Sequence, residues 1–417
     1  MSRTALLAGA ALSLATSGAL AEDALLDLSY KTRFVGEDRH LRDDSVFGPG
    51  LPLTSFGRDR ARLEGEARGK AGPISLLVTA RQSAREGERA EGELVANEAY
   101  SNFGAGANRY TAGKKILSGD VGFGFRPIDV LQREQRLQAL PPALEGIPHL
   151  AWEHYSADSA WTLVWANPTH ERRDEPRDDG SFALRHYSRW DKTDLHGVAR
   201  ISSRYKLETG AATSTVAHES LELHSSFLVQ RRDERRAPLA EPAATADLLA
   251  PDRALRTVTL DNPRKLLLGG TWTVESGWSL LAEAWYDGTA PTAEDWRTLA
   301  QQTERRRALI GTPGVPDAAV NGAIAASTRL FEAQNLTRRS ALGRLAWTDP
   351  AAGGWSASLD WLHSLEDGGW AATAAVGWEA DRLRLDAGLR RYGGKPDSAY
   401  RLLPERGLLF FGASLAF

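Results

Sequence analysis

The final eleven residues of the chain, 407–417, constrain its fold more than any other segment. Every second residue of this stretch is apolar or small: Leu409, Phe411, Ala413, Leu415 and Phe417. The two-residue period of a strand places them on one face. In a soluble protein such an uncharged terminal edge invites aggregation, whereas a barrel seals it against its first strand. The segment therefore predicts the closing strand of a β-barrel, with an ordinary buried strand as the alternative.

The beginning of the chain predicts export. Arg3 is the only charge in the first 21 residues, residues 4–15 are apolar or small, and Ala19-Leu20-Ala21 resembles a cleavage site. The apolar run is shorter than the roughly 20 residues that a helix needs to cross a bilayer. We therefore expect residues 1–21 to be a cleaved signal peptide and residues 22–417 to form a single domain. The alternation that ends in Phe417 then resembles the closing strand and assembly signal of bacterial outer-membrane barrels.

Composition agrees with an exported barrel. The chain has no cysteine, so its stability must come from a large sheet and not from disulfides. Its net charge of −3 is too small to indicate a partner, and it becomes about −4 once a signal peptide carrying Arg3 is removed. A charged content of 25% looks soluble, but a barrel with a wet lumen needs only every second strand residue to be apolar.

Eighteen alternating segments can be read along the chain, with sixteen as the alternative if the fourth, tenth or eleventh is misassigned. They cover 24–35, 59–69, 73–82, 94–103, 108–116, 148–156, 160–167, 181–190, 194–205, 211–218, 221–231, 264–274, 278–287, 337–348, 354–363, 369–378, 382–392 and 407–417. Every even-numbered connection is short. The long connections lie on the other side and include 36–58, 117–148, 168–180, 232–263, 288–335 and 393–406.

This asymmetry is typical of outer-membrane barrels. It predicts an all-β fold, a transmembrane antiparallel up-and-down β-barrel with short periplasmic turns and long extracellular loops. Both termini are expected in the periplasm of a Gram-negative bacterium. Aromatic residues near the expected strand ends, such as Trp165 and Trp272, fit the girdles of such a barrel, although a soluble sandwich could bury them in its core.

If the apolar faces contact lipid, positive charge predominates in the lumen. The candidate selectivity residues are Arg60, Arg62, Arg200, Arg204, Arg338, Arg344, Arg382, Arg384 and Arg390. Arginines 338 and 344 beside 382, 384 and 390 would form a basic track that favours anions. Alternatively, the arginines pair across strands with Glu64, Glu66, Asp360 and Asp386 and only stiffen a wet wall.

The connection 117–148 is long and charged enough to be a constriction loop, with Arg126, Asp129 and Arg133 as candidates, or else a solvated extracellular loop. The stretch from Tyr110 to Val130, which contains Gly-Phe-Gly-Phe-Arg-Pro-Ile-Asp, resembles a pattern of alginate-export-like and related porin-like outer-membrane barrels, as does Asn97-Glu98-Ala99-Tyr100 before it. The resemblance covers about residues 94–131. It implies an 18-stranded barrel with an arginine-rich lumen that conducts an acidic polysaccharide.

Catalytic and metal-binding patterns are lacking. The nine histidines are scattered without metal-ligand spacing, no local signature singles out a nucleophile, and the arginines alternate with acids instead of forming a nucleic-acid-binding face. We therefore expect no enzyme and no cofactor. The sequence favours an outer-membrane channel, a porin or export pore, for polar or anionic solutes or a polysaccharide. The alternative is a scaffold barrel that sheathes or docks a periplasmic or extracellular partner protein and conducts little.

Overall fold

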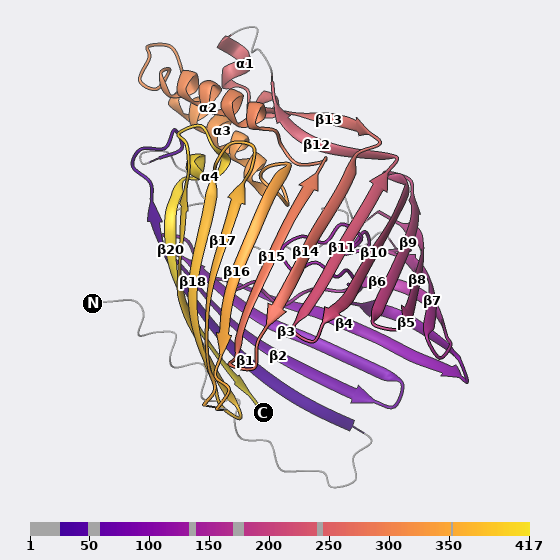
Figure 1. Cartoon of the computed structure of the whole chain (residues 1–417). Helices are drawn as coiled ribbons and strands as arrows, with labels where there is room; N and C mark the ends of the chain where they lie inside the picture. The colour runs from indigo at the N-terminus through magenta and orange to yellow at the C-terminus, as the bar shows by residue number, and fades with distance from the viewer. Residues whose placement is uncertain (1–25, 49–58, 133–138, 170–178, 240–244, 352) are drawn as a thin grey trace.

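The computed structural model describes residues 26–48, 59–132, 139–169, 179–239, 245–351 and 353–417. Eighteen strands form one antiparallel sheet (Figure 1). They are β1 Leu26–Leu41, β2 Arg60–Ala71, β3 Ile74–Arg85, β4 Glu91–Ala105, β5 Asn108–Lys115, β6 Ile147–Tyr155, β7 Ser159–Ala166, β8 Ser181–Trp190, β9 Thr193–Ser202, β10 Lys206–His218, β11 Leu221–Gln230, β14 Arg264–Thr273, β15 Trp278–Asp287, β16 Arg339–Thr348, β17 Trp355–Ser364, β18 Trp370–Glu379, β19 Leu383–Gly393 and β20 Glu405–Ala416. The predicted count of eighteen is confirmed.

The sheet closes on itself between its last and first strands. β20 runs antiparallel to β1, from Lys31 opposite Ala416 to His40 opposite Gly407. At the end of this seam the backbone of Phe417 donates to Tyr30 at 2.8 Å, and Tyr30 donates back at 3.2 Å. Because β1 also pairs with β2, neither strand leaves an open edge. The predicted closing strand is therefore confirmed as part of a closed barrel.

Alternation along the strands separates an apolar exterior from a polar interior. Large apolar side chains cover the outside, among them Leu94, Phe182, Ile201, Leu268, Leu359 and Phe411. In contrast, Glu64, Arg200 and Lys265 are almost fully buried inside the barrel. A continuous apolar belt of this kind is stable in lipid and not in water. None of the helices in the described part of the chain has the length and apolar character needed to span a membrane.

The two rims of the barrel differ. At the short-turn rim, strands are joined by tight turns such as Asp191-Lys192, and β20 ends there. The long-loop rim carries additional elements: β12 (Arg232–Pro238), α1 (Thr245–Leu249), η2 (Pro251–Arg253), β13 (Leu255–Asp261), α2 (Ala293–Arg307), α3 (Asp317–Ser327), η3 (Thr328–Glu332) and α4 (Ala399–Leu402). The helices stand above the rim formed by β16 to β20 (Figure 1).

Local sequence explains these elements of the long-loop rim. β12 and β13 form a two-stranded hairpin within the predicted connection 232–263. α2 begins at a capping box in which the Thr292 side chain and Asp295 satisfy each other's backbone N–H groups. Trp296 of α2, Ile324 of α3 and Phe47 then share a small hydrophobic core above the barrel. In these regions the long connections therefore fold into a hairpin and helices at the long-loop rim.

Candidate functional site

The connection between β5 and β6 folds into the barrel. We call its described residues, 116–132 and 139–146, the constriction loop. Ile128, Val130 and Leu131 pack against inward-facing side chains of β7 to β11, and Phe125 packs against Leu267 and Trp285 of β14 and β15. Of the two interpretations made from the sequence, the structure supports the inward loop and not the solvated extracellular one. The loop fills the half of the lumen next to β7–β15.

A buried carboxylate on the wall holds the tip of the constriction loop. Glu283 of β15 accepts hydrogen bonds from the backbone N–H groups of Phe123 at 2.6 Å and Gly124 at 2.8 Å. His224 of β11 contacts the same carboxylate at 2.9 Å. A Cβ atom on Gly124 would come within 2.8 Å of the end of the Leu342 side chain, so a larger residue would require Leu342 to move. The Gly-Phe-Gly sequence thus serves close packing against the wall, with the Phe123 ring directed toward the lumen.

A second buried carboxylate belongs to the loop itself. Asp120 accepts hydrogen bonds from the backbone of Val121 and Ile128, both at 2.7 Å, and from the Ser226 hydroxyl of β11 at 3.0 Å. Burial disfavours the charged form and raises the pKa of Asp120 to about 6, even though these donors oppose the shift and nearby Asp129 adds to it. Asp120 therefore titrates near neutral pH in the middle of the loop.

The charges expected to line the constriction instead shape the loop. Asp129 accepts from the backbone of Gly119 at 2.7 Å, and Arg126 donates to the carbonyl of Gly122 at 2.9 Å. Arg126 and Asp129 also form an ion pair at 3.4 Å. Arg133 lies outside the described residues. Arg126 and Asp129 thus act through the fold of the loop.

The other leg of the loop is attached to the opposite wall. Arg33 of β1 donates to the carbonyl of Pro141 at 2.8 Å, and Arg62 of β2 donates to the carbonyl of Leu140 at 2.9 Å. Asn97 of β4 donates to the carbonyl of Leu144 at 2.8 Å. The described residues of the loop thus contact β11 and β15 on one side of the lumen and β1, β2 and β4 on the other.

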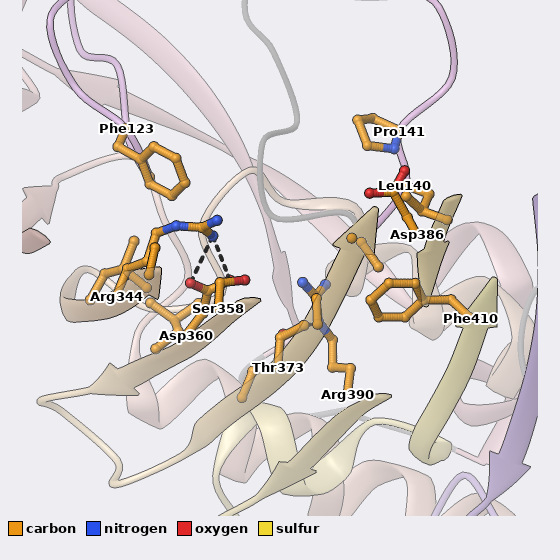
Figure 2. A pocket seen from close by; sticks show the side chains of 18 of the residues that line it. Phe123, Leu140, Pro141, Arg344, Ser358, Asp360, Thr373, Asp386, Arg390 and Phe410 are labelled. Carbon is orange, nitrogen blue, oxygen red and sulfur yellow. Dashed lines mark hydrogen bonds and ion pairs between the residues drawn. The ribbon is translucent and has the colours of Figure 1, made fainter. Parts of the chain in front are cut away.

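A cavity of about 1000 Å³ remains between the constriction loop and the wall formed by β16–β20 and β1. Figure 2 shows Phe123, Leu140 and Pro141 of the loop facing wall residues that include Arg344 and Arg390. The cavity reaches residues 331–336 below the helices at the long-loop rim and residues 347–348 near the short-turn rim. A second cavity, of about 320 Å³, lies toward β1–β3, and Arg60 and Arg390 line both. The open part of the lumen therefore runs along the barrel axis.

Basic side chains outnumber acidic ones along these cavities. The basic residues are Lys31, Arg33, Arg39, Arg60, Arg62, Arg85, Arg344, Arg384 and Arg390, and the acidic ones are Glu37, Glu332, Asp360 and Asp386. Some arginines are paired: Arg344 contacts both oxygens of Asp360, at 2.8 and 3.0 Å. Arg390 donates to the Thr373 hydroxyl at 2.7 Å. The lining therefore combines paired arginines with a net excess of basic side chains.

The structure brings only some of the candidate arginines to the cavities. Arg60, Arg62, Arg344, Arg384 and Arg390 line them. Arg200, in contrast, is buried behind the constriction loop, where it pairs with Glu208 at 2.8 Å and donates to the carbonyl of Val130 at 3.0 Å.

The remaining three candidates lie outside the strands and do not join the expected track. Arg204 is in the turn after β9 and pairs with Glu234 of the hairpin at 2.7 Å. Arg338 precedes β16 at the long-loop rim, whereas Arg382 precedes β19 at the short-turn rim. Residue parity could not reveal these strand ends: β9 stops at Ser202 instead of residue 205, and β16 and β19 begin at residues 339 and 383 instead of 337 and 382.

Several lining residues were absent from the candidates. Lys31, Arg33 and Arg39 of β1 line the larger cavity, and the alternation of the first strand already placed Lys31 and Arg33 on its polar face. No pattern in the sequence marked Phe123 and Leu140 of the loop as lining residues. Their position depends on contacts between the loop and residues distant in the sequence, such as Glu283. In the described part of the chain, no group of three His, Asp or Glu side chains is arranged to hold a metal ion.

Comparison with known proteins identifies the fold. No family model matches the sequence, and no curated protein matches it either. The outer membrane protein OpdK of Pseudomonas aeruginosa is similar in structure, with a TM-score of 0.54 and 9% identity over 94% of this chain and 98% of that one. OccK8 (OprE) of the same organism gives a TM-score of 0.54 at 8% identity, with the same coverage. OpdK with vanillate gives 0.53 at 11% identity, again over 94% and 98%.

These similarities show the fold, a closed β-barrel similar to those of outer-membrane porins. Identities of this size establish the fold and leave the solute open. The more specific likeness to alginate-export-like barrels receives no support from them, since the structural neighbours are OccK-type porins.

Proposed function

We propose that this chain is an outer-membrane channel that passes small anionic solutes between the constriction loop and the wall formed by β16–β20 and β1–β3. The observation that carries the proposal is the cavity of about 1000 Å³. Its lining residues extend from near one rim of the barrel to near the other, and basic side chains outnumber acidic ones among them. A wall of fixed positive charge raises the local concentration of anions and the rate at which they enter.

The lining also suggests what kind of anion fits. The loop side presents Phe123, Leu140 and Pro141, whereas the wall presents Arg60 and Arg390. A solute with one apolar face and one carboxylate could contact both sides at once. Vanillate, named with the similar barrel OpdK, has this chemistry and is a suitable probe. An acidic polysaccharide, implied by the alginate-export-like resemblance, is less favoured because the anchored loop divides the lumen.

Orientation follows from the general architecture of such barrels. We place the long-loop rim outside the cell and the short-turn rim, with the end of β20, in the periplasm. The scaffold alternative required a lumen filled by a partner or by loops. The constriction loop fills one half of the lumen and leaves the other half open, which favours the channel. We propose no enzymatic role.

Planar-bilayer recording of the purified barrel tests this function. We expect discrete ohmic current steps, a reversal potential in a salt gradient that indicates anion preference, and reduction of the chloride current by vanillate. A barrel that inserts but shows no current steps would support the scaffold instead. A cation-selective current would contradict the proposed lining.

A further inference from the structure

The second leg of the constriction loop, residues 139–144, separates the two cavities. Ala139 and Leu140 line both of them. A Cβ atom on Gly412 would lie 3.2 Å from Cδ1 of Leu140, so this side chain reaches the inner face of β20. Figure 2 shows Leu140 and the neighbouring Pro141 beside the larger cavity. Displacement of this leg would therefore join the cavities of about 1000 and 320 Å³.

The second leg is held less firmly than the rest of the loop. Residues 120–132 are mostly buried, whereas none of residues 139–144 is buried. No residue of this leg belongs to a hydrophobic cluster in the described part of the chain. Its backbone carbonyls instead accept hydrogen bonds from Arg33, Arg62 and Asn97 of the wall. A segment with few buried apolar contacts and accessible hydrogen bonds opens locally at a low cost in free energy.

The two arginines that hold the leg belong to a cluster with an excess of positive charge. Glu64 of β2 is fully buried. Its carboxylate lies 2.9 Å from Arg81, 3.1 Å from Arg62 and 4.0 Å from Arg33. Glu93 of β4 also pairs with Arg81, at 2.6 Å. Three guanidinium groups thus share two carboxylates in this cluster, and two of the three donate to neutral carbonyl oxygens of the leg.

A carboxylate is a better partner for these arginines than the leg is. It binds a guanidinium through two parallel hydrogen bonds and neutralises its charge, which a backbone carbonyl cannot do. Arg33 lines the larger cavity and Arg62 lines the smaller one. Their side chains are 20% and 18% exposed, so an anion can reach one guanidinium from each cavity. An entering carboxylate therefore competes with the leg for both arginines.

We propose that Arg33 and Arg62 form a carboxylate site that the second leg occupies in the absence of solute. A carboxylate that binds there displaces the leg from β1 and β2 and joins the two cavities into one passage. The tip of the loop stays in place, because Glu283 and Ser226 of the wall hold it. This inference rests on the proposed function, and it adds that the solute itself sets the width of its passage.

A nitroxide label on the leg of the full barrel in detergent micelles tests the proposal. The chain has no cysteine, so Ala143→Cys provides a single labelling site. We expect electron paramagnetic resonance spectra of a mostly immobile label in the absence of solute. Benzoate should raise the mobile fraction about fivefold or more, as is typical when a ligand is coupled to a conformational change. Benzamide has nearly the same shape without the charge and should leave the spectrum unchanged.

Two double variants in the labelled background identify the arginines responsible. Arg33→Ser/Arg62→Ser should give a mobile label without benzoate and no further change with it. The matched control is Arg85→Ser/Arg384→Ser, which removes two arginines that line the same cavities and pair with Glu88 and Asp386 instead of the leg. It should keep the full response at saturating benzoate. Heat-modifiable migration on gels establishes that each variant is folded.

Three results would overturn the proposal: a label that stays immobile in the wild type with benzoate, an equal response to benzamide, or a benzoate response that persists in Arg33→Ser/Arg62→Ser. Bilayer recording of the wild type separates this inference from the proposed function. An anion-selective channel whose label ignores benzoate would contradict only the inference. A barrel without anion preference whose label is released by benzoate would contradict only the proposed function.

Discussion

The guanidinium of Arg344 lies over the ring of Phe123, 5.1 Å from the ring centroid. Arg344 belongs to the wall and Phe123 to the tip of the constriction loop, so this contact joins the two sides of the larger cavity. Asp360 holds the same guanidinium through both of its oxygens, at 2.8 and 3.0 Å. The loop, the arginine and the carboxylate together form one border of the solute passage.

Removing the Phe123 ring should widen the passage. We expect Phe123→Ala to raise single-channel conductance, and the loss of the cation–π contact should cost only about 0.5–1 kcal/mol of stability. Phe125→Ala is the matched control because Phe125 is buried against the wall behind the loop. It should destabilise the loop by about 3–5 kcal/mol and give an unsteady current. Unchanged conductance in Phe123→Ala would show that the ring does not limit the passage.

Glu283 should determine how firmly the loop tip is held. In Glu283→Gln the neutral side chain offers one acceptor oxygen, so one buried N–H of Phe123 or Gly124 loses its partner, at a cost of about 1–3 kcal/mol. We expect faster hydrogen exchange at these two amides and more open-channel current noise. Glu222→Gln provides the comparison, because Glu222 binds Ser214 and not the loop. Equal noise in both variants would rule out a specific anchoring role.

Asp120 should make the loop sensitive to pH. Its pKa is raised to about 6 in the folded barrel, above the ordinary value of 3.8, so the folded state binds the proton more tightly than the unfolded state. The resulting stabilisation is complete below about pH 3.8 and is lost as pH rises through about 6. We expect exchange protection at Val121 and Ile128, corrected for intrinsic rates, to fall over this window. Asp120→Asn should remove the pH dependence, and its persistence would assign the effect to another group.

Deletion of Phe417 should slow assembly. The deletion removes both backbone hydrogen bonds to Tyr30 at the end of the closing seam, as well as the terminal ring. Phe417→Ser keeps the backbone bonds and loses only the ring, so it separates sealing from recognition of the aromatic end. We expect lower membrane levels for the deletion in a pulse-chase experiment. Normal levels and rates in the deletion would contradict a role of Phe417 in closure.

Local patterns in the sequence were sufficient for the barrel. The two-residue period predicted the eighteen strands, and the apolar alternation ending at Phe417 predicted the seam with β1. β1 nevertheless continues to Leu41, beyond the expected end at residue 35, and residues 36–41 pair there with β20. Strand ends depend on such partners from distant parts of the chain, which periodicity alone does not show.

The site was less predictable for the same reason. The constriction loop is positioned by Glu283, which lies about 160 residues from Phe123 in the sequence. Arg382 and Arg384 are two residues apart and were therefore expected on the same face of one strand. Only Arg384 lies within β19 and lines the cavity. The signal peptide predicted over residues 1–21 lies outside the described residues and stays a prediction, as does a mature protein that begins at Glu22.

Anion selectivity is the central claim, and the reversal potential in a salt gradient tests it most directly. Arg60 and Arg390 line both cavities, so Arg60→Ser/Arg390→Ser should lower the permeability of chloride relative to potassium while current steps persist. Arg204→Ser/Arg382→Ser removes the same charge from residues outside the strands and should retain the anion preference of the wild type. A wild type without anion preference, or equal reversal potentials in all three proteins, would contradict the account.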